Sequence, residues 1–217
     1  MISPSFLLDI VKLGLYDIIL YIDDSGSMAF EENGSRIDDL KLILQRVSFA
    51  ATLFDEDGIS VRFMNNAPGA NPRLDPSWLD HIRSEQDVDR LMQVIQFKGL
   101  TPMGTELRNK VVEPLILQKA RSGQLQKPVL VIAITDGQPA GEAQNAVTET
   151  IKYATQELSR TRYGQGAVAF QFAQVGNDEK AREFLSKLDA DPQVGHLIDC
   201  TSSKFTSTHS NKIKETN

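Results

Sequence analysis

Residues 17–28 read DIILYIDDSGSM, and this stretch decides the fold. Its first part, residues 17–22, is an almost unbroken apolar run, which is typical of a strand buried on both faces at the centre of a parallel sheet. Residues 129–134, VLVIAI, form a second run of the same kind. We therefore expect two central parallel strands, and the first of them passes directly into the polar residues 23–27.

Shorter strands and helices alternate along the chain around these two runs. Residues 59–63 and 168–172 alternate apolar and polar side chains, as strands nearer an edge do, and residues 196–200 indicate a further short strand. Strands that alternate with helices indicate βαβ units, and hence an α/β fold with a mostly parallel sheet. Apolar side chains spaced three and four residues apart predict helices with apolar faces over residues 6–13, 37–54, 88–95, 107–115, 147–158 and 181–188.

Capping signals mark the expected starts of several helices. Ser84 followed by Asp87 has the spacing of a capping box, in which each residue satisfies a free backbone amide of the other. Ser35 followed by Asp38 has the same spacing, and Asn177 is a candidate N-cap for the helix that follows it.

Prolines mark a bend and a loop. Pro114 predicts a kink inside the helix over residues 107–115, because proline lacks the amide that a helix needs. Residues 65–83 contain three prolines and few apolar side chains. We expect a long loop there, with a short edge strand near residues 79–82.

The composition is that of one globular domain. The chain has 217 residues, of which 41% are hydrophobic and 24% are charged, and its formal net charge is −6. A net negative charge argues against nucleic acid and against an anionic membrane as the main partner, because binding either of them requires a basic face. We expect one domain over residues 1–205 and a disordered polar tail over residues 206–217.

The sequence favours an intracellular protein, cytoplasmic or nuclear. The single cysteine, Cys200, cannot form an internal disulfide, so nothing indicates an oxidising compartment. The apolar residues near the N-terminus are interrupted by Asp9 and Lys12, which makes the run too short and too charged for a signal peptide or a membrane span. We therefore expect no membrane insertion.

Polar residues follow both central strands. Asp23, Ser25 and Ser27 stand two residues apart immediately after the first strand, and Asp136 follows the second in the sequence Thr-Asp-Gly. Between them, residues 99–105, GLTPMGT, form a loop that opens a helix. Ligand sites of open parallel sheets lie beyond the carboxyl ends of the strands, where the strand order reverses, so we expect these three segments to meet.

Together these segments resemble the von Willebrand factor type A family and its metal-ion-dependent adhesion site, whose pattern is Asp-x-Ser-x-Ser, a distant Thr and a distant Asp. Asp23, Ser25 and Ser27 match the first motif. Thr101 matches the isolated threonine and Asp136 matches the final aspartate. The resemblance extends from about residue 17 to residue 200. It implies a Rossmann-like, doubly wound sheet in the order 3-2-1-4-5-6, with helices on both faces and a short antiparallel edge strand as the third strand.

The side chains at these positions suit a hard divalent cation. Carboxylates, hydroxyls and water are oxygen ligands that select Mg²⁺, Mn²⁺ or Ca²⁺, and no His or Cys lies near the three loops to favour zinc. Because hydroxyls are neutral, an ion held largely by them keeps much of its positive charge and attracts an external carboxylate. Gly26 lets the backbone turn tightly, so that both serines face the ion. The resemblance implies that a partner protein supplies a Glu or Asp as the last ligand.

Each candidate ligand also has a purely structural interpretation. Asp23, Ser25 and Ser27 are residue types that favour turns and helix caps in any protein. Thr101 can serve as a helix N-cap, as a ligand or as both, and Asp136 can be a turn-forming residue.

The neighbouring acidic residues are not assigned to the site. Asp24 should point away from Ser25, because side chains alternate along an extended chain, and we expect it to be solvated. Glu31 and Glu32 are expected in a solvated loop that lies close enough to shape the rim of the site.

Three functions compete for this sequence. The first, which we expect, is a metal-dependent protein-interaction module, and the resemblance implies that such modules often act inside larger assemblies. The second is a hydrolase or phosphotransfer enzyme that uses the same ion. Against it, Ser25 stands where an aspartate nucleophile would want a second aspartate, and no Gly-rich phosphate loop follows a strand. The third is a scaffold that binds partners through its helix faces and has an incidental metal site. Because the sequence offers little support for catalysis, we expect no enzyme activity.

Overall fold

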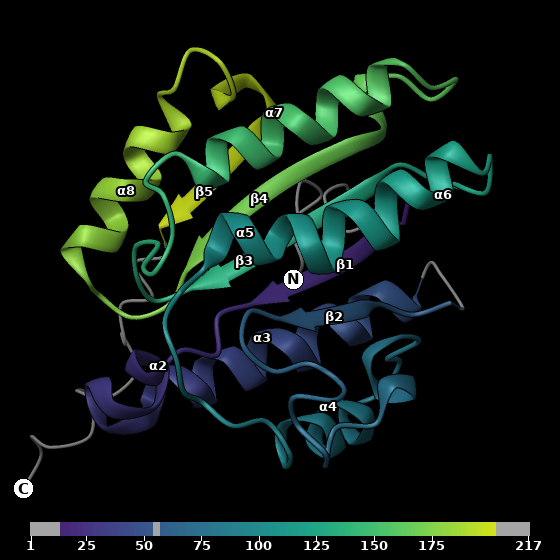
Figure 1. The fold of residues 1–217 in the computed structure, drawn as a ribbon. Helices are drawn as coiled ribbons and strands as arrows, with labels where there is room; N and C mark the ends of the chain where they lie inside the picture. The colour runs from purple at the N-terminus through teal and green to yellow at the C-terminus, as the bar shows by residue number, and fades with distance from the viewer. Residues whose placement is uncertain (1–13, 54–56, 203–217) are drawn as a thin grey trace, which may run out of the picture.

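A parallel sheet forms the centre of the protein (Figure 1). The structure is a computed structural model, and it describes residues 14–53 and 57–202. All pairings of the sheet are parallel, and the strand order is β2-β1-β3-β4-β5. The predicted strands are therefore confirmed, with ends that differ by a few residues from those expected. They are β1 (Asp17–Ile22), β2 (Ser60–Phe63), β3 (Val129–Thr135), β4 (Val168–Gln174) and β5 (Ile198–Ser202).

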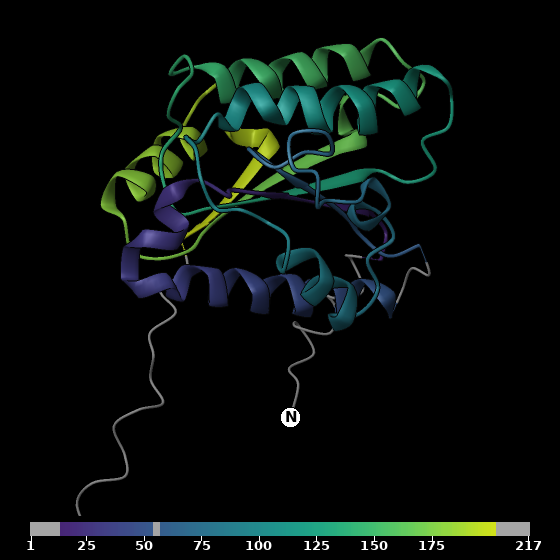
Figure 2. The same ribbon diagram turned by 60° about the horizontal axis from the view of Figure 1, so that its bottom comes forward.

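Helices cover both faces of the sheet (Figure 2). On one face lie α2 (Gly26–Phe30), the 3-10 helix η1 (Glu31–Gly34), α3 (Ser35–Thr52), η2 (Pro76–Leu79) and α4 (Glu85–Met92). On the other face lie α5 (Met103–Leu107), η3 (Arg108–Leu117), α6 (Gln118–Arg121), α7 (Ala146–Ser159) and α8 (Glu179–Asp189), with the short η4 (Gln165–Ala167) and η5 (Gly195–Leu197) beside β4 and β5.

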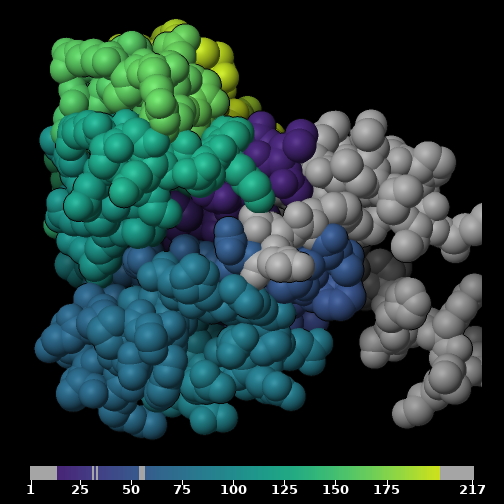
Figure 3. Space-filling model, turned by 90° about the vertical axis from the view of Figure 1, so that its right-hand side faces the viewer, coloured from purple at the N-terminus to yellow at the C-terminus, as the bar shows by residue number. Residues whose placement is uncertain are grey.

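The apolar runs of the sequence are buried because both faces are covered. On β1, Ile19 and Tyr21 pack against α5, η3 and α7, whereas Leu20 and Ile22 pack against α3 and β2. Figure 3 looks at the end of the molecule opposite to the strand carboxyl ends, and shows the teal and green residues of one layer above the blue residues of the other. Two hydrophobic cores, one on each face, thus hold the sheet.

The strand order reverses between β1 and β3, which lie side by side at the centre. From β1 the chain crosses to β2 on one side, and from β3 it crosses to β4 on the other. Ile22 pairs with Ile134, and the amide of Asp23 donates to the carbonyl of Ile134 at 2.9 Å. The segments that follow β1 and β3 therefore leave the sheet next to each other, where open parallel sheets place their ligand sites.

The expected antiparallel edge strand is reduced to a single bridge in the part of the chain that the structure describes. Ile59 and Ile82 form this isolated antiparallel bridge, at the edge where residues 79–82 were expected to pair. Residues 76–79 form η2 instead, and His81 has a φ of 58°, which does not fit an extended strand. The side chain of Arg62 bonds the carbonyl of Leu79, so this segment is held by a side chain where a backbone ladder was expected.

Two capping predictions give different outcomes on α4 and α8. Ser84 and Asp87 form the complete capping box that the sequence predicts. The N-cap of α8 is Asp178 and not Asn177, because the Asp178 carboxylate accepts a hydrogen bond from the amide of Ala181.

The predicted box at the start of α3 is absent. Ser35 is the first residue of α3 and its N-cap is Gly34, which makes no side-chain cap. Since η1 runs directly into α3, the amide of Ser35 already donates to the carbonyl of Glu32. Helical backbone therefore satisfies the amide that a capping side chain would otherwise serve.

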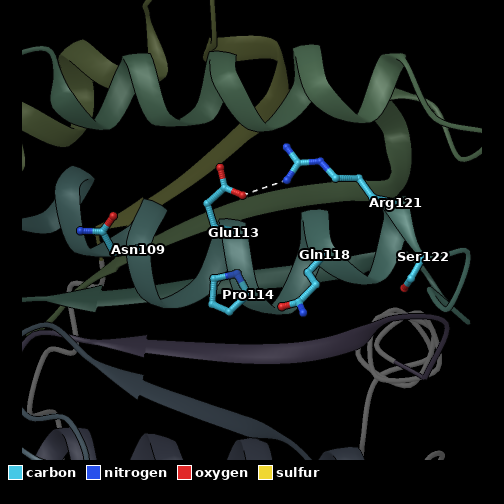
Figure 4. A pocket seen from close by; sticks show the side chains of 6 residues that line it. All are labelled: Asn109, Glu113, Pro114, Gln118, Arg121 and Ser122. Atoms are coloured by element: carbon cyan, nitrogen blue, oxygen red, sulfur yellow. Dashed lines mark hydrogen bonds and ion pairs between the residues drawn. The ribbon is translucent and has the colours of Figure 1, made fainter.

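Pro114 lies inside a continuous helical stretch. The ten residues of η3 are π-helical, and they join α5 to α6 through the proline. The wider π turn accommodates a residue that has no amide to donate. Figure 4 shows Pro114 on a surface pocket whose other lining residues are Asn109, Glu113, Gln118, Arg121 and Ser122.

Some predictions fall outside the described residues. These predictions are the helix over residues 6–13, the tail over residues 206–217 and both ends of the domain expected over residues 1–205. Within the described residues, no helix combines the length and the apolar character needed to cross a membrane.

We predict that Gly104→Ala destabilises the fold strongly. A Cβ at Gly104 would overlap the backbone of Ala146 and Val147 at the start of α7. Because backbone cannot yield as a flexible side chain can, the free energy of unfolding should fall by about 3 kcal/mol or more. Urea unfolding measures this loss. Gly166→Ala is the matched control, since its Cβ would meet no atom within 4 Å, and an equal loss in both variants would refute the packing argument.

Candidate metal centre

The predicted ligands come together at the carboxyl ends of β1 and β3, beside α2 (Figure 1). Ser25, Ser27, Thr101 and Asp136 line one pocket of about 320 Å³. Asp23 does not line this pocket, but it is fully buried directly behind it and bonds the backbone of Ser25. The structure therefore assembles all the predicted side chains in one place, from three segments that are far apart in the sequence.

Asp23 is held by two hydrogen bonds. Its Oδ1 accepts from the amide of Ser25 at 3.0 Å, and its Oδ2 accepts from the hydroxyl of Thr135 at 2.7 Å. Burial raises the pKa of the Asp23 carboxyl to about 6. The hydrogen bonds from Ser25 and Thr135 oppose this rise, and the nearby charge of Asp136 adds to it. Among the described residues, Asp23 is thus bonded only by neutral donors.

The two serines connect this region to Asp136. The hydroxyl oxygens of Ser25 and Ser27 lie 3.0 Å apart, and the Ser27 hydroxyl donates to Asp136 Oδ1 at 3.0 Å. Both hydroxyls face one pocket because Gly26 begins a new helix between them. The turn-and-cap interpretation does not account for these contacts, since the serine hydroxyls bond each other and an aspartate more than a hundred residues away.

Arg36 is the residue that sequence reasoning missed. It is 2% exposed, and its Nη1 donates to Asp136 Oδ2 at 2.6 Å. Its Nε and Nη2 donate to Glu32 Oε1 at 3.3 and 3.0 Å. A buried guanidinium paired on both sides neutralises Asp136 and fixes its orientation. The sequence carried a signal, because Arg36 lies four residues before Leu40 on the buried stripe of α3.

Glu32 has a more specific place than the solvated loop expected for it. Besides Arg36, it accepts a hydrogen bond from the amide of Asn177 at 3.2 Å, so it joins α3 to the loop before α8. It adopts a φ of 50°, in the left-handed region. The side chain is one-third exposed, which agrees with a position on the rim.

Asp24 is buried, which contradicts the expectation of a solvated side chain. It is 0% exposed and accepts from the backbone amides of Asn65 and Asn66, each at 2.7 Å. The side-chain amides of both asparagines also donate to it, at 3.1 and 2.5 Å. The alternation of side chains correctly predicted that Asp24 turns away from Ser25. The loop after β2, and not solvent, occupies that side.

The loop that carries Thr101 is fixed by bonds from several directions. The Gly26 amide donates to the carbonyl of Gly99 at 3.3 Å, and the side-chain amide of Asn65 donates to the carbonyl of Leu100 at 2.9 Å. Gly99 has a φ of 98°, which only glycine adopts readily. These contacts place Thr101 opposite the serines without any contribution from its own side chain.

Thr101 is not a helix cap. The N-cap of α5 is Pro102, and the free amides of Gly104 and Thr105 are satisfied by the Glu142 carboxylate at 2.8 and 2.7 Å. Thr101 is 5% exposed, and its hydroxyl makes no hydrogen bond to any residue that the structure describes. A nearly buried hydroxyl on the pocket wall is thus available to a ligand.

The donor set fits a hard divalent cation. One carboxylate and three hydroxyls line the pocket, from Asp136, Ser25, Ser27 and Thr101, and the carboxylate of Asp23 lies behind them, bonded to the backbone of Ser25. Within the described residues no three His, Cys, Asp or Glu side chains gather as a metal cluster, so a site here depends on hydroxyl oxygens. Such a set excludes the soft ligands that select zinc and copper, and it matches Mg²⁺ or Mn²⁺.

The pocket has further walls that local sequence signals could not reveal. Gly137, Gln138 and Ala140 of the loop after β3 line it, and so do Asp178 and Lys180 at the start of α8. Asp178 and Lys180 lie more than forty positions from the nearest predicted ligand, and the packing of α8 beside β4 brings them to the site.

We predict that Asp23→Asn stabilises the metal-free protein above neutral pH. The folded-state pKa of about 6 lies above the ordinary 3.8, so ionised Asp23 destabilises the fold. That cost is absent near pH 4, grows as the pH rises through 6 and is complete above it. The amide keeps both hydrogen bonds, because the Thr135 hydroxyl can accept as well as donate.

The gain should reach up to about 3 kcal/mol near pH 8 and vanish near pH 4. Urea unfolding in EDTA at both pH values measures it. Asp39→Asn, which removes an exposed carboxylate of α3, is the control and should show no such pH dependence. A loss of stability for Asp23→Asn at high pH would contradict the electrostatic account.

Comparisons with known proteins bear on the fold. No protein-family model matches the chain, and no curated protein matches it in sequence. A solved structure of a von Willebrand factor type A protein from Catenulispora acidiphila superposes with a TM-score of 0.52, at 15% identity over 87% of this chain and 39% of that one. Proximal thread matrix protein 1 from the mussel byssus superposes with a TM-score of 0.50, at 17% identity over 87% of this chain and 44% of that one.

A third structure, manganese-loaded TRAP protein of Plasmodium vivax, covers 88% of this chain and 69% of its own at 17% identity. Its TM-score of 0.45 is too low to add to the argument. This chain spans less than half the length of the first two structures, so the likeness concerns one domain of each. The strand order, the helices on both faces and these superpositions agree: the chain has the fold of a von Willebrand factor type A domain.

Proposed function

We propose that this protein is a divalent-metal-dependent protein-interaction module. One observation carries the proposal: carboxylates and hydroxyls from three distant segments meet around a single pocket at the carboxyl edge of the sheet. Mg²⁺ or Mn²⁺, or alternatively Ca²⁺, would be held by Asp23, Ser25, Ser27, Thr101 and Asp136. The bound ion would supply positive charge that attracts an acidic side chain of a partner protein, and that carboxylate would complete the coordination of the ion.

The charges around the pocket support an acidic ligand. The carboxylates of Asp23 and Asp136 offset the two charges of one ion, and Arg36 is offset by Glu32 on its other side. The hydroxyl ligands add no charge, and Asp178 and Lys180, which both line the same pocket, offset each other. With the ion in place, a carboxylate from outside therefore meets no uncompensated negative charge.

We propose binding and not catalysis as the role of this site. No His or Cys side chain is among the residues that line the pocket. The Ser27 hydroxyl donates to Asp136, but that carboxylate is also paired with Arg36, which makes it a weak base for activating a serine. We further propose that the module acts inside the cell, since its single cysteine leaves it without an internal disulfide. We propose as well that it acts as part of a larger assembly, as the resemblance implies.

We predict that Mg²⁺ and Mn²⁺ raise the melting temperature and that Ser27→Ala reduces this effect. An ion that binds only the folded state adds about 2.7 kcal/mol when its concentration is a hundred times its Kd. Isothermal calorimetry gives the affinity and differential scanning fluorimetry gives the shift in melting temperature. Ser27→Ala should weaken Mn²⁺ binding at least tenfold. Loss of a group that only orients a metal ligand typically lowers the metal affinity by about tenfold or more, and loss of the ligand itself should lower it at least as much.

Ser35→Ala is the matched control for Ser27→Ala. Ser35 is exposed at the start of α3, eight residues away in the sequence, and does not line the pocket. Its variant should bind Mn²⁺ as the wild type does. No binding heat and no thermal shift with either metal in the wild type would contradict the proposal, and so would equal affinity in Ser27→Ala.

A further inference from the structure

Two large apolar side chains stand exposed close to the candidate metal centre. Phe30 is 84% exposed and Leu100 is 61% exposed. Phe30 ends α2, the helix that carries Ser27, and Leu100 directly precedes Thr101. Each is therefore part of a segment that also supplies a candidate ligand.

Phe30 lies over the turn between the two serines. Its ring carbons stand 3.7 and 3.8 Å from the place where a Cβ on Gly26 would lie, and the carbonyl of Gly99 faces the same place at 4.0 Å. The Phe30 ring and the Gly99 carbonyl are therefore both within 4.0 Å of the same point beside Gly26. Phe30 and the Gly99–Leu100 segment thus both lie close to the short stretch of backbone that joins Ser25 to Ser27.

The fold holds Leu100 in its exposed position. Its carbonyl accepts from the Asn65 side chain at 2.9 Å, and its side chain lines the pocket. Gly141 has a φ of 81°, and a Cβ there would lie 2.7 Å from Leu100 Cδ1. The absence of a side chain at residue 141 thus makes room for Leu100, which stays at the surface although apolar side chains usually withdraw from water.

An apolar rim around a charged centre defines the chemistry of a ligand. The metal ion of the proposed function would favour an acid at the base of the pocket, whereas the exposed Phe30 and Leu100 favour hydrocarbon at its edge. Consecutive residues of an extended chain are about 3.8 Å apart, so a ligand with its acid in the pocket brings the adjacent side chain to the rim. Exposed apolar residues beside a polar centre are typical of interaction sites.

We propose that Phe30 and Leu100 form an apolar rim that selects partners in which the acidic residue is next to a large aliphatic or aromatic residue. This inference rests on the proposed function, and it adds the identity of the residue beside the acid. A second copy of this chain and an acid without an apolar neighbour are the competing occupants.

Small peptides test this rim directly. The probes are N-acetyl-Asp-Leu-amide, N-acetyl-Asp-Gly-amide and N-acetyl-Asn-Leu-amide, titrated into the full chain with saturating Mg²⁺ and again in EDTA, with amide chemical shifts as the readout. The Asp-Leu peptide should bind about tenfold more tightly than the Asp-Gly peptide, because a leucine side chain leaves water. The Asn-Leu peptide should not bind, and EDTA should abolish the binding of both Asp peptides.

Variants assign the preference to the two residues. Phe30→Ser and Leu100→Ser should each lower the preference for Asp-Leu over Asp-Gly to less than about threefold, measured at a Mg²⁺ concentration that saturates each variant. Phe49→Ser and Leu53→Ser are matched controls, since these side chains are 63% and 57% exposed. Phe49 lies thirteen residues beyond Arg36 on α3, about 20 Å along the helix, so its loss should leave the preference intact.

The outcomes separate this inference from the proposed function. Mg²⁺-dependent binding of both Asp peptides with equal affinity, or a preference that survives in Phe30→Ser and Leu100→Ser, overturns the rim and leaves the proposed function standing. Binding of no peptide with Mg²⁺ present overturns both. Equal binding of the Asn-Leu and Asp-Leu peptides would overturn the inference, because the rim would then be a general apolar contact. Variants that change only self-association in analytical ultracentrifugation would also overturn it, because the occupant would then be a second copy of this chain.

Discussion

The parallel pairing of β1 with β3 brings two buried carboxylates together, and the structure around them depends on how their charges are compensated. Asp23 and Asp136 follow the paired residues Ile22 and Ile134 of the two central strands and are 0% and 1% exposed. Two such charges repel each other and lose hydration, so each needs partners in the fold. Arg36 compensates Asp136, whereas Asp23 has only neutral donors among the described residues. Burial, and to a lesser extent the charge of Asp136, raises the pKa of Asp23 to about 6 against the lowering effect of these donors. A divalent ion would supply the missing charge.

This compensation links the site to the packing of both layers. Arg36 reaches Asp136 because it lies on the buried stripe of α3, and Glu32 ties the same guanidinium to the loop before α8. On the other side, Asp24 binds the loop after β2, which in turn fixes the carbonyl of Leu100. The segments around the pocket are therefore held before any ligand arrives, which lowers the cost of ordering them on binding.

Much of this arrangement could be predicted from the sequence, because burial on two faces leaves a plain signature. The apolar runs at residues 17–22 and 129–134 predicted the central strands, and strand-end chemistry predicted which side chains meet beyond them. Contacts between distant residues that carry no motif could not be predicted in this way. Arg36 lies just before the helix predicted over residues 37–54 and was assigned no role. Asp24 was expected in solvent because nothing in the sequence indicates that the loop after β2 folds over it. Lys180 reaches the pocket only through the packing of α8.

The central claim is that oxygen atoms from these three segments hold one metal ion. The most direct measurement is the anomalous diffraction of a crystal of this protein soaked in Mn²⁺. The account predicts a single strong anomalous peak in the pocket, within coordination distance of the hydroxyls of Ser25, Ser27 and Thr101, with Asp23 and Asp136 bound directly or through water. A pocket without a peak at saturating Mn²⁺, with Ser27 still donating to Asp136, would contradict it.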